Sequence, residues 1–557
     1  MAAVSKLEPV RGNPRSRRRG ARLRGLLRLL VPRRPKALRD SLTRWLLFGA
    51  AIGLVAGAGA VVFYWCLGRA TGWLLVGLGG YQPPTTVGEG GGLTGGGFTR
   101  PWAVPLVTCG GALVAGLLVA AFAPEAKGHG TDAAIHAVHH EPTALRGRVA
   151  LVKIVASSLV IGSGGSGGRE GPAAQISATV VSMLCGRFRV PRRDARIAVS
   201  AGMAAGIGAI FRAPLGGALL GAELLYRNDL EADAIMPSLV SSITAYAVFG
   251  AVNGFQPIFG TMSALTFTHP VTLVWFALLG VAAGLAGRVY AGLFQRGGAA
   301  LRRLPVPAAL LPALGGLAVG LLGLAVPAAL GTGYGWVQLE MRADRLLAAP
   351  LWLVLVIPLV KVLATTLSIG SGGSGGVFGP GMVVGGCTGG ALWRVLAALP
   401  WTGASPAPYV IVGMIACFGA IAHAPLGVML MVAEMTGNLS LLAPAMIAVA
   451  IATLVVGERT IYVNQLEDRL ESRALYAEQA RSGGGPAPGG RPRMVGMVWA
   501  LGILVVGVIA LGLWAARGHL GQLGPQLPER PGPDLPDGPV SAEDLRAVRF
   551  AVVTRGY

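Results

Sequence analysis

The chain has 557 residues, of which 53% are hydrophobic and only 13% are Asp, Glu, Lys or Arg, and its mean hydropathy is +0.61. Soluble globular proteins carry about 25% charged residues, so this composition excludes a soluble enzyme, and its apolar content excludes a disordered scaffold. Glycine accounts for 86 residues, without the Gly-X-Y period of collagen. We therefore expect an all-α polytopic membrane protein.

Residues 1–44 form a basic arm ahead of the first apolar segment. The arm holds 14 Lys and Arg residues against two acidic residues, Glu8 and Asp40, and so supplies over half of the formal net charge of +22. Basic residues next to a membrane segment favour the cytoplasmic side and attract anionic lipid. No motif that reads nucleic acid accompanies them, so we expect a cytoplasmic N-terminus and no nucleic-acid partner.

Apolar segments then recur along the chain up to residue 457. Several are shorter than the about 20 residues that a helix needs to cross a bilayer, and others are interrupted by Gly and Pro. Short, interrupted segments in both halves of a transporter indicate a binding site built from broken helices. The segments lie at 46–78, 103–123, 149–161, 198–224, 235–258, 271–294, 306–330, 349–369, 381–399, 408–435 and 441–457.

Two blocks of sequence occur twice. Residues 153–172 (KIVASSLVIGSGGSGGREGP) match residues 361–380 (KVLATTLSIGSGGSGGVFGP), 208 positions later. Residues 202–223 (GMAAGIGAIFRAPLGGALLGAE) match residues 413–434 (GMIACFGAIAHAPLGVMLMVAE), 211 positions later. The same order at nearly the same offset predicts a duplicated bundle.

These patterns divide the chain into five parts. We expect a membrane transport domain over 45–478, a Gly/Pro linker over 479–494, one extra transmembrane helix over 495–516 and a polar, Pro-rich tail over 517–557. The tail follows a helix preceded by arginines, which places it on the far side of the membrane. The two repeats within the transport domain cover about 45–258 and 271–475.

The repeated GSGGSGG segments follow apolar runs, and Pro172 or Pro380 stands a few residues later. Proline is favoured in the first turn of a helix, so the glycines let one helix end and another begin at membrane depth. Free N–H groups and positive dipole ends would then face inward from both repeats, which favours an anion site. Two other interpretations are close packing of helices through small residues and a G-x-G-x-x-G nucleotide fingerprint, but the fingerprint lacks the strand–helix alternation that it needs.

Glu170 is an acidic residue at the start of the first predicted half-helix. A carboxylate inside a membrane is costly and usually functional. In its ionised form Glu170 would occupy the place of an anion, and protonation would release it. The alternative is a plain N-terminal capping carboxylate, since the second repeat carries Phe378 at the equivalent position.

GREGP at 168–172 and GVFGP at 376–380, together with APLGG and APLGV blocks that each precede a glutamate (Glu223 and Glu434), resemble signature motifs of the CLC chloride channel and transporter family. The resemblance extends over about residues 45–475. It implies a bacterial-type homodimer without a regulatory C-terminal domain, in which each subunit has its own pore and two inverted-topology halves.

The resemblance also implies the roles of individual residues. Glu170 matches the gating glutamate, and the backbone N–H groups of the GREGP motif line the outer part of the path at Arg169, Glu170 and Gly171. Val377 and Phe378 match residues whose N–H groups hold the central anion, and Tyr462 matches a tyrosine whose hydroxyl contacts it. From the bare sequence, Tyr462 would instead be an aromatic residue of the membrane interface.

Two departures from the family pattern leave details open. The first family motif, usually Gly-Ser-Gly-x-Pro, is best matched by Gly128, His129 and Gly130, so that an imidazole replaces a hydroxyl and Asp132 replaces the proline. The choice between chloride, nitrate and other anions therefore stays open. Leu224 stands where family antiporters often carry an inner, proton-transferring glutamate, which weakens the case for strict exchange.

Three further groups of residues have simpler interpretations. His136 and His140 are spaced to bind a metal on one helix face, yet a solvated patch with His139 and Glu141 is the better interpretation, so no metal is expected. Lys153 and Lys361 match between the repeats and are explained by snorkelling to the interface. The five cysteines are odd in number and form no C-x-x-C, which argues against disulfides and zinc.

Together these observations predict transport of chloride or a similar anion across the cell membrane, gated by a protonatable glutamate and with proton counter-transport left open. The alternative within transport is a proton-uncoupled chloride channel. A membrane-embedded enzyme or a scaffold is a remote alternative, because paired acid–base residues and metal clusters are missing from the sequence. We expect no enzymatic activity, no cofactor beyond the transported anion, and as partners the lipid bilayer, protons and a second copy of the chain.

Overall fold

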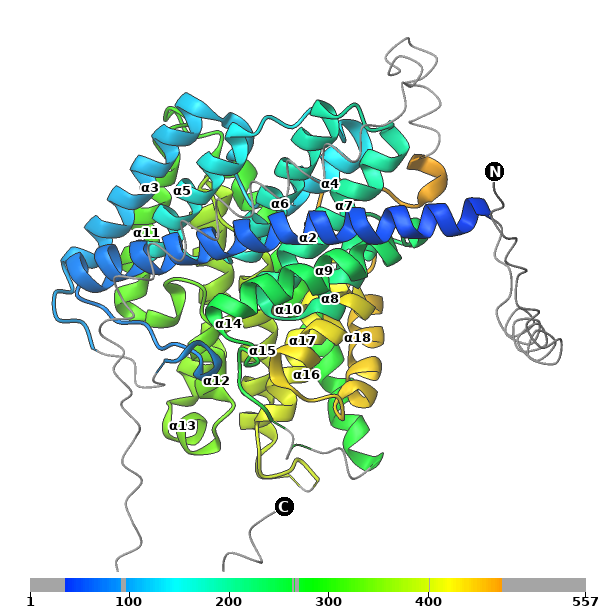
Figure 1. Cartoon of the computed structure of the whole chain (residues 1–557). Coiled ribbons are helices and arrows are strands. Elements are labelled where there is room, and N and C mark those ends of the chain that lie inside the picture. The colour runs from blue at the N-terminus through cyan, green and yellow to red at the C-terminus, as the bar shows by residue number, and fades with distance from the viewer. Residues whose placement is uncertain (1–35, 92–96, 263–264, 266–269, 400, 473–557) are drawn as a thin grey trace, which may run out of the picture. The chain divides into compact units, whose positions relative to one another are not determined.

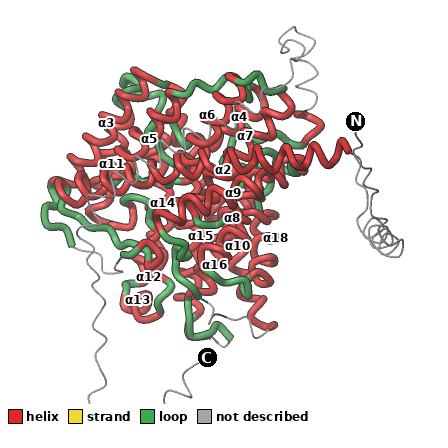
Figure 2. Tube along the Cα trace, viewed as in Figure 1, coloured by secondary structure: helices red, strands yellow, loops and turns green. Residues whose placement is uncertain are grey.

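A computed structural model describes residues 36–91, 97–262, 265, 270–399 and 401–472, all within the first of two compact units into which the chain divides after Val506. This part of the chain consists of helices and loops, and no strand occurs among its residues (Figure 2). Residues 1–35 of the basic arm, the linker at 479–494, the extra helix at 495–516 and the tail lie outside the described residues.

The helices follow one another closely along the chain (Figure 1). In chain order they are α2 (Lys36–Ala70), η1 (Thr71–Leu78), η2 (Val87–Glu89), α3 (Ala103–Phe122), η3 (Pro124–Ala126), α4 (Thr131–His140), α5 (Arg148–Gly162), α6 (Glu170–Arg187), α7 (Arg192–Phe211), α8 (Pro214–Glu223), α9 (Ala232–Asn253), η4 (Pro270–Thr272), α10 (Leu273–Leu301), α11 (Leu311–Ala325), η5 (Pro327–Ala329), α12 (Tyr334–Glu340), α13 (Ala343–Ala348), α14 (Leu351–Thr365), η6 (Thr366–Gly370), α15 (Phe378–Leu396), α16 (Ala407–Ile421), α17 (Pro425–Thr436) and α18 (Leu442–Val456).

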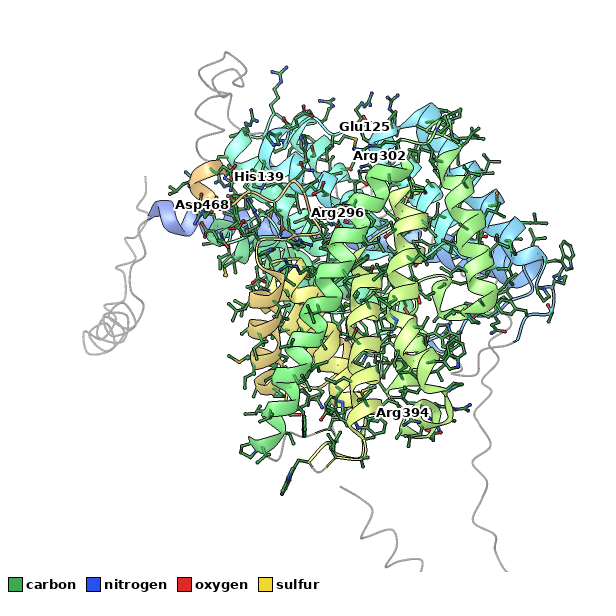
Figure 3. All side chains as sticks on the ribbon, turned by 180° about the vertical axis from the view of Figure 1, so that it is seen from behind. Glu125, His139, Arg296, Arg302, Arg394 and Asp468 are labelled. Carbon is green, nitrogen blue, oxygen red and sulfur yellow. The ribbon has the colours of Figure 1, made fainter. Side chains whose placement is uncertain are left out.

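Six helical segments of the described chain are long and apolar enough to cross a membrane, and several shorter apolar helices accompany them. The first, α2, begins at Lys36, earlier than the apolar segment predicted from residue 46, and packs on α7 and α9 (Figure 1). Charged side chains mark opposite ends of the bundle, with Glu125 and Arg302 at one end and Arg394 at the other (Figure 3). The pattern of a polytopic membrane protein is therefore present in the structure.

The predicted breaks fall at the glycine-rich segments. Helix α5 ends at Gly162 and α6 begins at Glu170, while η6 ends at Gly370 and α15 begins at Phe378, so both prolines stand in a first helical turn. The turns contain Gly164 at φ +108° and Gly372 at φ +107°, a backbone conformation that favours glycine. Two predicted apolar segments, 198–224 and 408–435, are likewise each broken into two helices before Pro214 and Pro425.

Equivalent residues of the two repeats contact one another reciprocally. Gly168 and Gly376 exchange two backbone hydrogen bonds, of 2.7 and 2.6 Å. Two further hydroxyl pairs, each 2.9 Å apart, repeat the pattern: Ser157 with Ser374, and Ser166 with Thr365. Because the partners exchange roles under the 208-residue offset, the repeats are related by an approximate two-fold axis.

The matched lysines also obey this symmetry, but they do not snorkel. The side chains of Lys153 and Lys361 are fully buried. Lys153 Nζ donates to the carbonyls of Ala126 and Gly128, at 3.0 and 2.7 Å. Lys361 Nζ donates to the carbonyls of Ala329 and Gly331, at 3.4 and 2.8 Å. The snorkelling prediction is therefore wrong: each ammonium group binds the carbonyls of a neighbouring loop and holds that loop against its repeat.

Candidate functional site

The starts of α6 and α15 lie side by side, because Gly168 and Gly376 join the two turns just ahead of them. The first hydrogen bond within α15 runs from Gly381 to Val377, which leaves the N–H groups of Val377 and Phe378 without an intrahelical acceptor. The corresponding bond of α6 runs from Ala173 to Arg169. Two sets of free N–H groups thus converge in the buried centre of the domain.

The carboxylate of Glu170 occupies this centre. Its side chain is 1% exposed, and Oε2 accepts a hydrogen bond of 3.3 Å from the N–H of Gly379 in the first turn of α15. Oε1 accepts a bond of 2.5 Å from the hydroxyl of Tyr334. A Cβ atom on Gly168 would lie 2.1 Å from Oε2, so only glycine leaves room for the carboxylate there. The carboxyl group of Glu170 therefore sits at the half-helix start of the opposite repeat.

Arg169 lies beside Glu170 and is nearly as buried, at 4% exposure. Its guanidinium group forms an ion pair of 2.5 Å with Glu89 in η2. It also lies over the rings of Tyr64 and Tyr334, 5.3 and 5.7 Å from their centroids. The charge of Arg169 is thus partly neutralised from the loop after α2.

On another side of the centre, His129 and Tyr462 come together, with ring centroids 5.6 Å apart. Tyr462 is fully buried, so its interpretation as an interfacial aromatic is wrong. Within the described part of the chain, the Tyr462 hydroxyl and His129 Nδ1 are buried without a hydrogen-bond partner. Unsatisfied buried polar atoms are rare in folded proteins, so these two atoms are candidates for ligand binding.

The residues around His129 explain how it is held. The carbonyl of Gly128 accepts the bond from Lys153, and Gly130 adopts φ +85° at the start of α4. Asp132, which replaces the proline of the family motif, accepts a bond of 2.8 Å from the N–H of Asn464. This departure therefore has a structural role, because it ties the segment that carries Tyr462 to α4.

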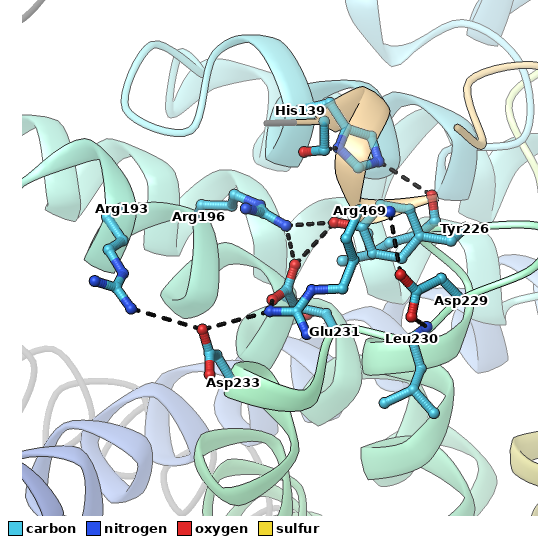
Figure 4. A network of polar contacts seen from close by, with 12 residues as sticks. His139, Arg193, Arg196, Tyr226, Asp229, Leu230, Glu231, Asp233 and Arg469 are labelled. Carbon is cyan, nitrogen blue, oxygen red and sulfur yellow. Dashed lines mark hydrogen bonds and ion pairs between the residues drawn. The ribbon is translucent and has the colours of Figure 1, made fainter. Parts of the chain in front are cut away.

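The chain that follows Tyr462 is held by a network of ion pairs near the starts of α7 and α9 (Figure 4). Arg469 pairs with Glu231 at 3.3 Å and with Asp233 at 3.6 Å, and Arg196 also pairs with Glu231. The carbonyl of Leu466 accepts a bond of 2.9 Å from the N–H of Arg227. Opposite charges thus fix the chain just beyond Tyr462.

The histidine cluster is only partly the solvated patch that the sequence predicts. His136 is exposed and its ring lies 4.4 Å from that of His140, but His139 is buried and its Nε2 lies 3.1 Å from the carbonyl of Leu225. Burial lowers the pKa of His139 to about 4, so the imidazole stays neutral near pH 7. The prediction for His139 is therefore wrong, and this residue packs α4 onto the following segments.

Leu224 and the two repeated glutamates also have clear positions. Leu224 is buried directly after α8, and its carbonyl accepts a bond of 3.0 Å from Gln465. Glu223 accepts bonds from the N–H groups of Leu426 and Gly427 at the start of α17. Glu434 accepts the equivalent bonds from Leu215 and Gly216 at the start of α8. Each repeat thus caps a helix of the other.

Tyr334 and Glu89 are the two site residues that the sequence analysis missed. Tyr334 follows GTG at 331–333, which is spaced like the GHG at 128–130, and this similarity could have indicated it. Glu89 lies in a glycine-rich loop and carries no comparable signal. Its approach to Arg169 depends on how that loop folds back over α6.

Two repeats with half-helices that start at a common buried centre define a polytopic membrane protein of the transport class. Residues 111–457 match the family model described as voltage gated chloride channel, and the chain belongs to this family. The resemblance seen in its motifs is thereby confirmed.

Similar sequences and structures agree with this family. A ClcB-like protein of Ralstonia nicotianae is 34% identical over 410 residues, which cover 72% of this chain and 91% of that protein. A voltage-gated ClC-type chloride channel, ClcB, of Salmonella typhimurium is 35% identical over 306 residues, 55% of this chain and 72% of that protein.

The structure of a slow cyanobacterial Cl−/H+ antiporter covers 78% of this chain and 99% of its own, with a TM-score of 0.64 and 23% identity. A CLC-type fluoride/proton antiporter covers 76% and 98%, with a TM-score of 0.62 and 21% identity. The predicted all-α fold with two inverted-topology repeats and broken half-helices is therefore confirmed.

Proposed function

We propose that the protein carries chloride or a chemically similar anion across the cell membrane, with Glu170 as a protonatable gate. One observation carries the proposal: the Glu170 carboxylate accepts a hydrogen bond from Gly379 at the start of the opposite half-helix. Helix N-termini attract anions through free N–H groups and the positive dipole end, so a chloride ion and the ionised gate compete for the same place.

The path that we propose runs from the gate to His129. The backbone N–H groups of Arg169, Glu170 and Gly171 line its outer part, and those of Val377 and Phe378 hold the central anion. The Tyr462 hydroxyl, buried without a partner among the described residues, donates to the same anion. Farther in, the anion passes Gly128, His129 and Gly130. Backbone dipoles supply most of the attraction, because Arg169 is paired with Glu89.

Protonation moves the gate. The ionised carboxylate is held by hydrogen bonds that favour its charge, whereas the neutral acid loses most of this advantage and yields to the anion. Each release of Glu170 thus takes up a proton, which permits exchange of anions against protons. Leu224 offers no inner proton acceptor, and this observation favours a second candidate, a chloride channel without proton coupling.

The experiment that tests the proposal measures anion and proton movement together. Purified protein is reconstituted into chloride-loaded vesicles, and efflux is followed with a chloride electrode while external pH is recorded. Chloride efflux must exceed that of protein-free vesicles; its absence with folded protein would refute anion transport. A fixed ratio of protons to chloride identifies an exchanger, and chloride flux without proton movement identifies a channel. Nitrate and fluoride in the same vesicles test the influence of His129 on selectivity.

We propose the remaining features of the protein on the same basis. The membrane domain covers 45–478, with repeats at about 45–258 and 271–475, and an extra transmembrane helix at 495–516 follows the linker at 479–494. The N-terminus is cytoplasmic because of its basic residues. The protein has no enzymatic role and needs no cofactor beyond the transported anion.

Two short helices support a homodimer. Helices α8 and α17 have 10 and 12 residues, too few to cross the bilayer, and Leu215 and Leu426 at equivalent places in their first turns are 50% and 54% exposed. A second copy that covers this apolar face explains both exposures. Light scattering in detergent should give the mass of a dimer, and Leu215→Trp together with Leu426→Trp should shift it toward the monomer.

A further inference from the structure

The shortest hydrogen bond to the Glu170 carboxylate comes from the second repeat. Tyr334, the first residue of α12, donates its hydroxyl to Oε1 at 2.5 Å and is 2% exposed. The preceding Gly333 has φ +90°, which turns the chain so that Tyr334 enters the centre. The hydroxyl therefore contacts the gate directly and from an element outside the GREGP motif.

The surrounding structure keeps this hydroxyl in place. The Tyr334 ring packs against Phe211 and Phe259, with centroids 6.5 and 6.1 Å away. One turn later, Gln338 donates a bond of 2.8 Å to the carbonyl of Phe259 and accepts one of 3.0 Å from the N–H of Val87. Helix α12 is thereby fixed on both sides, and the orientation of Tyr334 follows from it.

A charged pair lies on the other side of the gate. Glu89 binds Arg169 and also accepts hydrogen bonds from Thr86 and Tyr64, of 3.1 and 3.4 Å. Its loop is held by Arg212, which donates a bond of 2.7 Å to the carbonyl of Gly88. Glu89 therefore neutralises the cation nearest to Glu170 from a fixed position.

Other titratable groups near the gate come from further elements. The Tyr290 hydroxyl of α10 donates to the carbonyl of Val377 at 2.9 Å, and Tyr462 lies across the proposed anion site. Lys361 binds the carbonyl of Gly331, three residues before Tyr334. Of these groups, Tyr334 is the side chain that donates a hydrogen bond to the Glu170 carboxylate, and Arg169 is the adjacent full charge.

We propose that Tyr334 is a positioning residue whose hydrogen bond holds the ionised Glu170 side chain in the anion path; we call this bond the latch. Glu89 weakens the hold on Glu170 by neutralising Arg169. Together the two residues set the pH at which the path opens. The proposal rests on the proposed function. A hydroxyl that donates to a carboxylate favours its ionised form, and so does an unpaired neighbouring cation. Loss of Tyr334 and loss of the Glu89 charge must therefore act in opposite directions.

The test is the pH dependence of anion efflux from reconstituted vesicles. In Tyr334→Phe the pH of half-maximal flux should rise by about one unit, since a hydrogen bond to a charged group is lost. At a pH above the midpoint this shift should raise flux about tenfold. In Glu89→Gln the pH of half-maximal flux should fall by about half a unit. The charge of Arg169 is then no longer neutralised by Glu89, so it stabilises the ionised form of Glu170 more strongly.

Matched variants separate the latch from a general effect of mutation. Tyr409 has a buried hydroxyl that donates to the carbonyl of Thr402 at 3.2 Å, so Tyr409→Phe removes a comparable bond away from the gate and should leave the midpoint unchanged. In a Glu170→Gln background, neither Tyr334→Phe nor Glu89→Gln should alter the pH response.

The outcomes distinguish this proposal from the proposed function. Absence of flux in the unaltered protein would overturn both. Two outcomes would overturn the latch alone, provided that the unaltered protein shows normal flux. One is an unchanged pH of half-maximal flux in Tyr334→Phe. The other is a shift of this pH in the same direction in Tyr334→Phe and Glu89→Gln. The latch is supported if the two variants shift the pH of half-maximal flux in opposite directions and if both shifts disappear in the Glu170→Gln background. Should Tyr334→Phe fail to fold, Glu89→Gln alone decides: a lowered midpoint supports the proposal and an unchanged one refutes it.

Discussion

The two repeats share a backbone and differ in a few side chains at its centre. Their turns have nearly the same φ, +108° at Gly164 and +107° at Gly372, and the half-helices start at equivalent residues. The first repeat places Glu170 at that start, and the second places Phe378 there. The symmetric backbone therefore brings two helix starts together, and the side chains that differ between the repeats give one of these starts an ionisable group.

The loops that precede α4 and α12 show the same combination of a shared backbone and different side chains. Gly128 and Gly130 have positive φ, as do Gly331 and Gly333 of the second repeat. The residue after each loop differs: Thr131 opens α4, whereas Tyr334 opens α12 and reaches Glu170. The Glu170 carboxyl group and its hydroxyl partner thus come from opposite repeats.

The largest expected effect follows from exchanging the central side chains. Glu170→Gln should abolish the pH dependence of chloride flux, because an amide cannot ionise, whereas Phe378→Leu should keep it. Flux measured from pH 4.5 to 7.5 should vary by about tenfold or more in the unaltered protein and stay nearly constant in Glu170→Gln. A full pH response in Glu170→Gln would remove this residue from gating and break the contrast between the repeats.

A second pair of variants concerns stability. Lys153→Met and Lys361→Met each remove a buried amine donor from two carbonyls, at a cost of up to about 2–4 kcal/mol. Thermal unfolding in detergent should show the smaller loss in Lys153→Met, because the carbonyls of Ala126 and Gly128 keep bonds from the Ser374 hydroxyl and the N–H of Gly375. Lys153→Met should in addition change the ratio of chloride to nitrate flux, because Gly128 adjoins His129. An equal change in Lys361→Met would contradict this asymmetry.

The smallest effect should come from the reciprocal caps. Glu223→Gln and Glu434→Gln weaken bonds to the first turns of α17 and α8, each by about 1 kcal/mol, since a charged acceptor at a helix start becomes neutral. Both variants should lower the unfolding temperature slightly and to the same extent. A loss of proton movement in Glu223→Gln alone would show that this cap also belongs to a proton path.

The sequence predicted much of the fold because its signals are local. Duplicated blocks give the repeats, and a glycine-rich segment followed by proline gives the start of a half-helix. The inference failed where burial depends on distant segments. Lys153, Lys361 and Tyr462 are residue types typical of a membrane interface, yet the tertiary structure buries all three.

By itself, the sequence determined the membrane class, the duplication, the broken helices and the acid at one of their starts. Only the tertiary structure decided that this acid lies against the other repeat, beside Tyr334 and an Arg169 that Glu89 neutralises. The physical reason is that residues 170 and 379 are far apart along the chain. Their contact follows from how the two halves pack, and no local pattern encodes it. The many glycines of the chain contribute to this packing: a side chain at Gly168 or Gly376 would clash where the two halves meet, and their absence lets the Glu170 carboxyl group reach the N–H of Gly379.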